Sequence, residues 1–145
     1  MLHRVVTLVG VVLALAGCSP WEPTPPSGFV NGTSVHTINV GGRDRTYRLD
    51  KPAGLAASAL LVVMLHGGFG SAAQAERAYG WDELAASGKF VVAYPDGLNR
   101  AWNVNGGGWC GRPAREGVDD VAFISAAVAG IIKNVSVING PRCRM

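Results

Sequence analysis

The sequence predicts an α/β fold built around a strand–helix–strand unit. Two short apolar segments, residues 60–65 and 90–94, have the length of buried strands, and each ends at a glycine-containing turn. Between them, small and apolar side chains recur at helical spacing up to residue 87. Strand, helix and strand in this order form a crossover that joins parallel strands, so we expect the segment 60–65 to be buried on both faces.

An antiparallel hairpin is predicted ahead of this unit. Val35–Val40 and Arg45–Leu49 have the alternation of short strands, and Gly41-Gly42-Arg43-Asp44 between them is a turn signal. Tyr47 and Leu49 share one face of the second strand. The hairpin would therefore open the sheet with one face available for the core.

Local signals place two helices and one long loop. Ser71 and Gln74 fit a capping box at the start of the first helix, which Gly80 weakens and Gly88 is expected to stop. Residues 98–117 have the composition of a long glycine-rich loop, a length that usually signals function or disorder.

A second helix is expected after this loop. Asp119 or Asp120 would cap it, and the helical pattern runs to about residue 134. The two carboxylates could instead form an acid/base pair, but their place before an apolar helix favours capping. The apolar stripe of this helix is predicted to consist of Val121, Ile124, Val128, Ile131 and Ile132.

Composition excludes several function classes. The chain has 145 residues, of which 48% are hydrophobic and 16% charged, which suits one modest domain rather than a disordered chain. The net charge of +3 comes from scattered basic residues with no long basic run, so no nucleic-acid partner is expected. The three cysteines and three histidines lack metal-ligand spacing, and neither a metal nor a cofactor is predicted.

The N-terminus has the features of an export signal. An apolar run follows His3 and Arg4 and ends in Leu15-Ala16-Gly17-Cys18, which resembles a bacterial lipoprotein signal. We expect residues 1–17 to be removed, Cys18 to be lipidated and inserted in the membrane, and the proline-rich residues 18–33 to act as a tether. The protein would then be exported, as a cell-envelope lipoprotein or in secreted form. A plainly cleaved signal peptide or a retained anchor are the alternatives, and mass spectrometry of the mature N-terminus distinguishes them from diacylated Cys18.

Six motifs occur in one order along residues 34–134, and together they carry a family resemblance. They are Leu65-His66-Gly67-Gly68, Gly80-Trp81, Val91-Val92-Ala93-Tyr94-Pro95-Asp96-Gly97, Trp102-Asn103, Gly108-Trp109-Cys110 and Val118-Asp119-Asp120-Val121-Ala122-Phe123. This set resembles the secreted polyhydroxybutyrate depolymerase and feruloyl esterase family of α/β-hydrolases. The resemblance implies the N-terminal part of a doubly wound sheet, a serine mechanism, an oxyanion hole and an ester or polymer substrate; it implies no oligomeric state.

The catalytic triad of that family has no counterpart in this sequence. No serine lies in a G-x-S-x-G elbow, and no histidine follows His66. We therefore expect a partial hydrolase domain over residues 34–137 and a divergent tail over residues 138–145, from a frameshift, a truncated gene or a shortened gene model. Such a chain would be inactive as written. The alternative is a small exported lipoprotein that binds a glycan, phenolic or polyester ligand through its tryptophan-containing loop.

The resemblance also assigns roles to individual residues. Gly68 and Phe69 would form the oxyanion-type loop, although the same residues could make only a tight turn. His66 and Gly67 would scaffold that loop, and a general-base role for His66 is not expected because no serine lies in a nucleophile context. Trp102 and Trp109 could line a substrate surface or pin a loop to the core.

Overall fold

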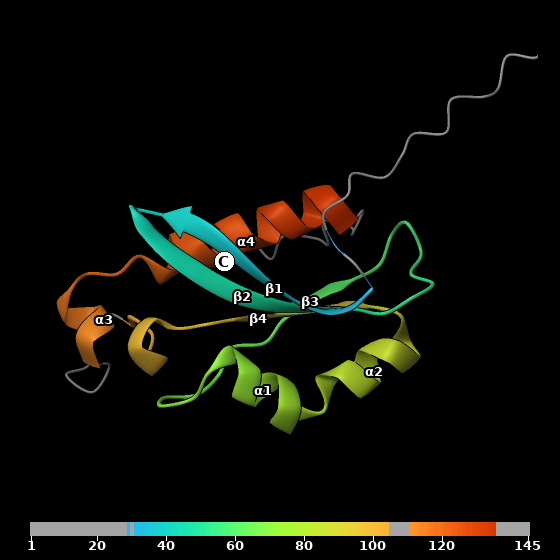
Figure 1. Cartoon of the computed structure of the whole chain (residues 1–145), viewed down its shortest axis with the longest axis horizontal. Helices are drawn as coiled ribbons and strands as arrows, with labels where there is room; N and C mark the ends of the chain where they lie inside the picture. Colours follow the sequence, from blue (N-terminus) through green and yellow to red (C-terminus); the bar gives the residue numbers. More distant parts are fainter. Residues whose placement is uncertain (1–28, 30, 105–110, 136–145) are drawn as a thin grey trace, which may run out of the picture.

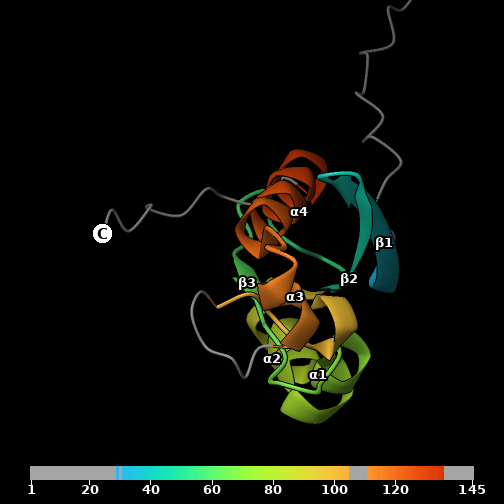
Figure 2. The ribbon, with the colours of Figure 1, turned by 90° about the vertical axis from the view of Figure 1, so that its left-hand side faces the viewer.

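A four-stranded mixed sheet lies between helices on its two faces. The structure is a computed structural model that describes residues 29, 31–104 and 111–135. Its elements are β1 (Gly32–Val40), β2 (Arg43–Lys51), β3 (Leu61–Val63), α1 (Ala72–Tyr79), α2 (Trp81–Gly88), β4 (Val91–Pro95), the 3-10 helix η1 (Leu98–Arg100), α3 (Gly111–Arg115) and α4 (Asp120–Val135). Helix α4 covers one face of the sheet, and α1 and α2 cover the other (Figures 1 and 2).

The strand order β1-β2-β4-β3 confirms both predicted units. β1 and β2 form the antiparallel hairpin, β2 pairs antiparallel with β4, and β3 pairs parallel with β4. The hairpin turns through Gly41 and Gly42, whose φ angles of 59° and 75° suit the left-handed positions of a two-residue turn. Both hairpin strands are longer than predicted, because ladder pairing continues through polar residues that the apolar alternation does not include.

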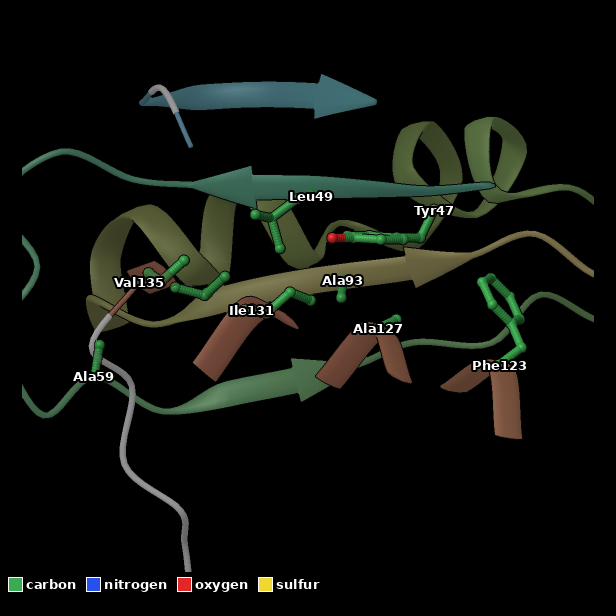
Figure 3. Close-up of a cluster of buried hydrophobic side chains, with 9 residues drawn as sticks. Tyr47, Leu49, Ala59, Ala93, Phe123, Ala127, Ile131 and Val135 are labelled. Atoms are coloured by element: carbon green, nitrogen blue, oxygen red, sulfur yellow. The ribbon is translucent and has the colours of Figure 1, made fainter. Parts of the chain in front are cut away.

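β4 is the centre of the structure because both of its faces are buried. Val91 and Ala93 face α4, whereas Val92 and Tyr94 face α1 and α2, as the alternation of a strand requires. All five residues of β4 are buried, which confirms this predicted strand. The cluster under α4 consists of Tyr47, Leu49, Ala59, Val91, Ala93, Phe123, Ala127, Ile131 and Val135 (Figure 3).

The prediction of complete burial is wrong for the segment 60–65. Only Leu61–Val63 forms β3, and these three residues are half-buried. Leu60 and Leu65 are 61% and 42% exposed. The reason is that β3, within the part of the chain that the structure describes, pairs with β4 alone and so lies at an edge of the sheet.

Glycine positions change the predicted first helix. Gly80, at a φ of 71°, ends α1 and begins α2, so the stretch is two helices rather than one weakened helix. Ser71 caps α1 as expected, by accepting a hydrogen bond from the Gln74 N–H at 3.2 Å. The predicted stop at Gly88 is one residue early, since Lys89 takes the left-handed position with a φ of 56°.

The last helix is present but turned from its predicted orientation. Residues Asp120, Phe123, Ala127, Ile131 and Val135 are buried, whereas Val121, which was placed in the apolar stripe, is 75% exposed. The rotation brings the Asp120 carboxylate to a buried arginine, and Ile124 and Ile132 pack only at the margin of the core. The predicted loop 98–117 also contains η1 and α3, which the glycine-rich composition concealed.

A polar cluster lies under α1 and α2. Arg48 Nε donates to Glu76 Oε2 at 2.5 Å, and the Tyr94 hydroxyl donates to Asp82 Oδ1 at 2.5 Å. Asp50, beside Arg48 on the same strand face, is 9% exposed. The cluster therefore places three carboxylates near a single guanidinium. Across the described ranges, no helix is long and apolar enough to cross a membrane.

Candidate active-site pocket

The candidate site lies where β3 and β4 end. These strands are parallel, so their carboxyl ends lie at the same end of the sheet. The segments that follow them, residues 64–70 and 96–104, therefore meet there. Ligands of open α/β sheets bind outside the carboxyl ends of the strands. The predicted oxyanion-type turn therefore lies in the usual place for a site of this fold class.

His66 joins the two segments from a fully enclosed position. It is 2% exposed, and its Nε2 accepts the backbone N–H of Gly97 at 2.9 Å. An acceptor nitrogen carries no proton, so Nδ1 holds the proton and donates to the Gly67 carbonyl at 2.8 Å. Both ring nitrogens are thus engaged within the protein, and neither is presented to a substrate as a base.

Trp102 packs on the same histidine. The two ring centroids are 4.9 Å apart, and the indole N–H donates to the His66 carbonyl at 2.9 Å. Trp102 also lines the pocket described below, so it both pins its segment and contributes to the cavity wall. Trp109, the second predicted lining residue, lies outside the described residues.

Two hydrogen bonds join the segment 64–70 to the segment 96–104 at the protein surface. The Phe69 N–H donates to the Arg100 carbonyl at 2.9 Å, and Arg100 Nε donates to the Gly70 carbonyl at 3.3 Å. Phe69, Asn99 and Arg100 hold positive φ angles of 62°, 50° and 62°. Non-glycine residues in this region store conformational strain, which clusters at functional sites.

The two segments form most of the wall of an open pocket of about 230 Å³. It is lined by Gly68, Phe69, Asn99, Arg100, Ala101, Trp102, Val104 and Gly111. Phe69 and Val104 are 76% and 61% exposed, so much of the apolar wall faces solvent.

The two predicted oxyanion donors differ in availability. The N–H of Phe69 is occupied by the Arg100 carbonyl. The N–H of Gly68 has no hydrogen-bond partner within the described segments, and Gly68 is exposed at the pocket. Gly68 is therefore the donor that this conformation leaves free.

Solved structures of similar fold were found, although no family model matches the chain and no match was found among curated proteins. An acetyl xylan esterase from Aspergillus awamori matches with a TM-score of 0.57 and 18% identity, over 72% of this chain and 39% of that one. A cold-adapted esterase from an Arctic intertidal metagenomic library matches at 0.54 and 23%, over 69% and 44%. The poly(3-hydroxybutyrate) depolymerase LpqC from Bordetella parapertussis matches at 0.53 and 19%, over 71% and 38%.

This chain has part of an α/β-hydrolase fold. It spans about two fifths of the length of those three structures. The TM-scores above 0.5 establish the fold, whereas identities of 18–23% establish neither activity nor substrate.

In this hydrolase fold, a buried ion pair holds the pocket segment against the sheet. Arg45 and Asp120 are joined at 2.6 Å with side chains 3% and 7% exposed. The second Asp120 oxygen accepts the Asn103 N–H at 2.6 Å, and Arg45 also donates to the Asp96 carbonyl at 3.3 Å. Asp119 is the helix cap, through the Ala122 N–H at 2.8 Å. The two neighbouring carboxylates therefore do different structural work, and they do not form an acid/base pair.

The sequence reasoning missed a serine–histidine contact on β1. Ser34 Oγ lies 2.7 Å from His36 Nε2, and burial lowers the pKa of His36. His36 packs between Phe29 and Tyr47, on the hairpin and away from the residues that line the pocket. The i, i+2 spacing on one strand face was the signal that could have revealed it.

The structure does not test the prediction for the cysteines. Cys18, Cys110 and Cys143 lie outside the described residues, so the lipidation of Cys18 stays a prediction. Among the side chains that the structure does describe, no group of three or more His, Cys, Asp or Glu could hold a metal ion.

Proposed function

We propose that this chain supplies the carbonyl-binding side of a carboxylic ester hydrolase site. The observation that carries the proposal is the free Gly68 N–H at an apolar-walled pocket, at the carboxyl ends of two parallel strands. A backbone N–H after the third strand of such a sheet donates to the oxygen on which charge develops during acyl transfer. Solved structures of like fold include enzymes named for acetyl xylan and poly(3-hydroxybutyrate), which supports esters as the substrate class.

His66 acts in this proposal as a scaffold. Its ring ties Gly67 to Gly97, and its carbonyl holds the Trp102 indole, so the turn that carries Gly68 is held from two sides. Such support keeps a donor aimed at its target without reorganisation during binding. The geometry supports orientation of the loop and gives His66 no free nitrogen for proton transfer.

Serine-mechanism turnover is not expected from the chain as printed. The sequence contains no G-x-S-x-G elbow and no histidine after His66. A nucleophilic serine needs a base within hydrogen-bond reach and a third group that orients the base. We therefore expect esters to bind at the pocket without being hydrolysed above background.

A titration with a small neutral ester, ethyl benzoate, tests this proposal. We expect saturable changes in the NMR signals of the Gly68 amide and the Trp102 indole N–H. Phe69→Ala should weaken the binding by about tenfold, because it removes an exposed apolar wall of the pocket. Leu84→Ala is the matched control, since Leu84 is a 53% exposed residue on α2. Equal losses in the two variants, or changes confined to α1 and α2, would contradict the proposal.

Hydrolysis of p-nitrophenyl acetate is measured in parallel. Rates at background are expected for the native sequence and for His66→Ala. Turnover together with fluorophosphonate labelling of a single serine would show that a nucleophile had been overlooked. Ser34→Ala then decides whether the serine beside His36 is that nucleophile.

The alternative of a glycan-, phenolic- or polyester-binding lipoprotein has less support. Trp102 uses its indole N–H on the His66 carbonyl and packs its ring against the imidazole. It is therefore partly committed to holding the loop and does not offer an open platform. No other observation in the described ranges favours this alternative.

A further inference from the structure

We propose that the pocket recognises a free carboxylate through Arg100, so that its ligands are small anions with a flat apolar body. This inference rests on the proposed function for the identity of the pocket, and it adds a charge preference that a neutral ester site does not need. Acids of this kind are what hydrolysis of an ester releases. The argument depends on the charge, the backbone and the walls of the pocket.

Arg100 is the cation of the pocket. It lines the cavity and is exposed, and none of the lining residues is acidic. Within the described segments, Arg43, Arg45, Arg48 and Arg112 pair with carboxylates, whereas Arg77, Arg100 and Arg115 are in no ion pair, and of these three only Arg100 lines the pocket. A guanidinium has five N–H donors, and one of those in Arg100 bonds the Gly70 carbonyl. The remaining donors are free of protein carboxylates.

The backbone at Arg100 is held in a costly conformation. Asn99 and Arg100 are consecutive residues with φ angles of 50° and 62°. Glycine would adopt these angles without steric cost. Hydrogen bonds from Arg100 N to the Gly97 carbonyl and from Phe69 N to the Arg100 carbonyl, 3.1 and 2.9 Å long, keep the segment in place. Strained residues of this kind cluster at ligand-binding sites, so the backbone conformation supports a functional role for this part of the cavity wall.

The other residues that line the pocket suit the apolar part of a ligand. Phe69, Trp102 and Val104 line the cavity, and its volume of about 230 Å³ matches a small ligand. Guanidinium and carboxylate form paired, charge-assisted hydrogen bonds, which give direction as well as attraction. A planar acid such as benzoate therefore combines the two chemistries that the wall offers.

Binding of benzoate and of benzamide to the full chain tests the inference, since the two have nearly the same shape and only benzoate is charged. We expect benzoate to bind about tenfold more tightly at low salt, with the difference reduced at high salt. Arg100→Gln should lower the benzoate affinity to about that of benzamide, so that the difference between the two ligands is lost. Arg77→Gln, which removes an exposed arginine on α1, should leave both affinities unchanged.

A second variant guards against simple misfolding. Arg100→Gly suits the φ of 62°, so we expect it to be at least as stable as the native sequence and also to lose the carboxylate preference. If benzoate and benzamide bind equally, or if Arg77→Gln loses as much as Arg100→Gln, the inference is wrong. Ethyl benzoate binding with no preference for benzoate would refute the inference and leave the proposed function standing. Benzoate binding without ester binding would refute the proposed function and leave the carboxylate preference standing. If neither ligand binds, the proposed function and the inference are both refuted.

Discussion

Asp120→Ala is expected to lower the free energy of unfolding by about 3–5 kcal/mol. The substitution leaves the Arg45 guanidinium, whose side chain is 3% exposed, without its carboxylate partner. It also removes the acceptor of the Asn103 N–H, which fastens the pocket segment to α4. Urea unfolding of the native and variant chains, followed by tryptophan fluorescence, measures the loss.

The neighbouring carboxylate provides the control. Asp119→Ala removes an exposed helix cap and should cost only about 1 kcal/mol. Replacing both ion-pair partners, as Arg45→Met with Asp120→Leu, should recover much of the loss, because no buried charge is then left alone. Similar losses for Asp119→Ala and Asp120→Ala would mean that the ion pair contributes no more than a surface contact.

Asp50→Asn is expected to stabilise the protein by about 1–2 kcal/mol at pH 7 and to have little effect near pH 4. Burial, and then the negative charges of Asp82, Glu76 and Glu83, raise the pKa of Asp50 from 3.8 to about 6. The folded state therefore holds a proton that the unfolded chain releases at lower pH. The stability due to this proton is present below about pH 4 and is lost as the pH rises through 6.

Thermal unfolding between pH 4 and 8 measures this dependence. Burial also raises the pKa of Asp82, which accepts the Tyr94 hydroxyl and lies near Arg48, so part of the slope should remain in the variant. Asp44→Asn, at an exposed position in the hairpin, should shift stability by less than about 0.5 kcal/mol at every pH. A native protein that gains stability from pH 4 to 7 would contradict the expected sign.

Local sequence signals predicted the elements whose causes are local. Gly41 and Gly42 determine a tight turn, Ser71 caps a helix through its own next turn, and the apolar run to Tyr94 forms a strand buried on both faces. Each of these outcomes depends on residues only a few positions apart. The order of hairpin, strand, helix and strand then restricted the topology to a mixed sheet.

Contacts between distant residues decided the rest. Asp120 meets Arg45 from 75 positions away, on the side of α4 that faces the sheet, whereas Val121 faces solvent. The exposure of Leu60 followed from the sheet neighbours of β3, which its own apolar residues do not specify. The spacing of apolar residues along the chain cannot predict such contacts, because a buried charge and its distant partner form no repeating sequence pattern.

For the pocket, too, some features were predicted from the sequence and others came only from the structure. The apolar strand followed by glycines predicted a turn that presents backbone N–H groups, and the family resemblance assigned His66, Gly68 and Phe69 to that turn. Trp102 was predicted to line a surface or to pin a loop. Three features came from the three-dimensional contacts alone: the Phe69 N–H is occupied, both nitrogens of His66 are engaged, and Arg100 lines the cavity. Hydrogen-bond donors and acceptors pair with whichever groups the fold brings within about 3 Å. Residues 66–70 and 97–104 are far apart in the sequence and meet because β3 and β4 pair in parallel.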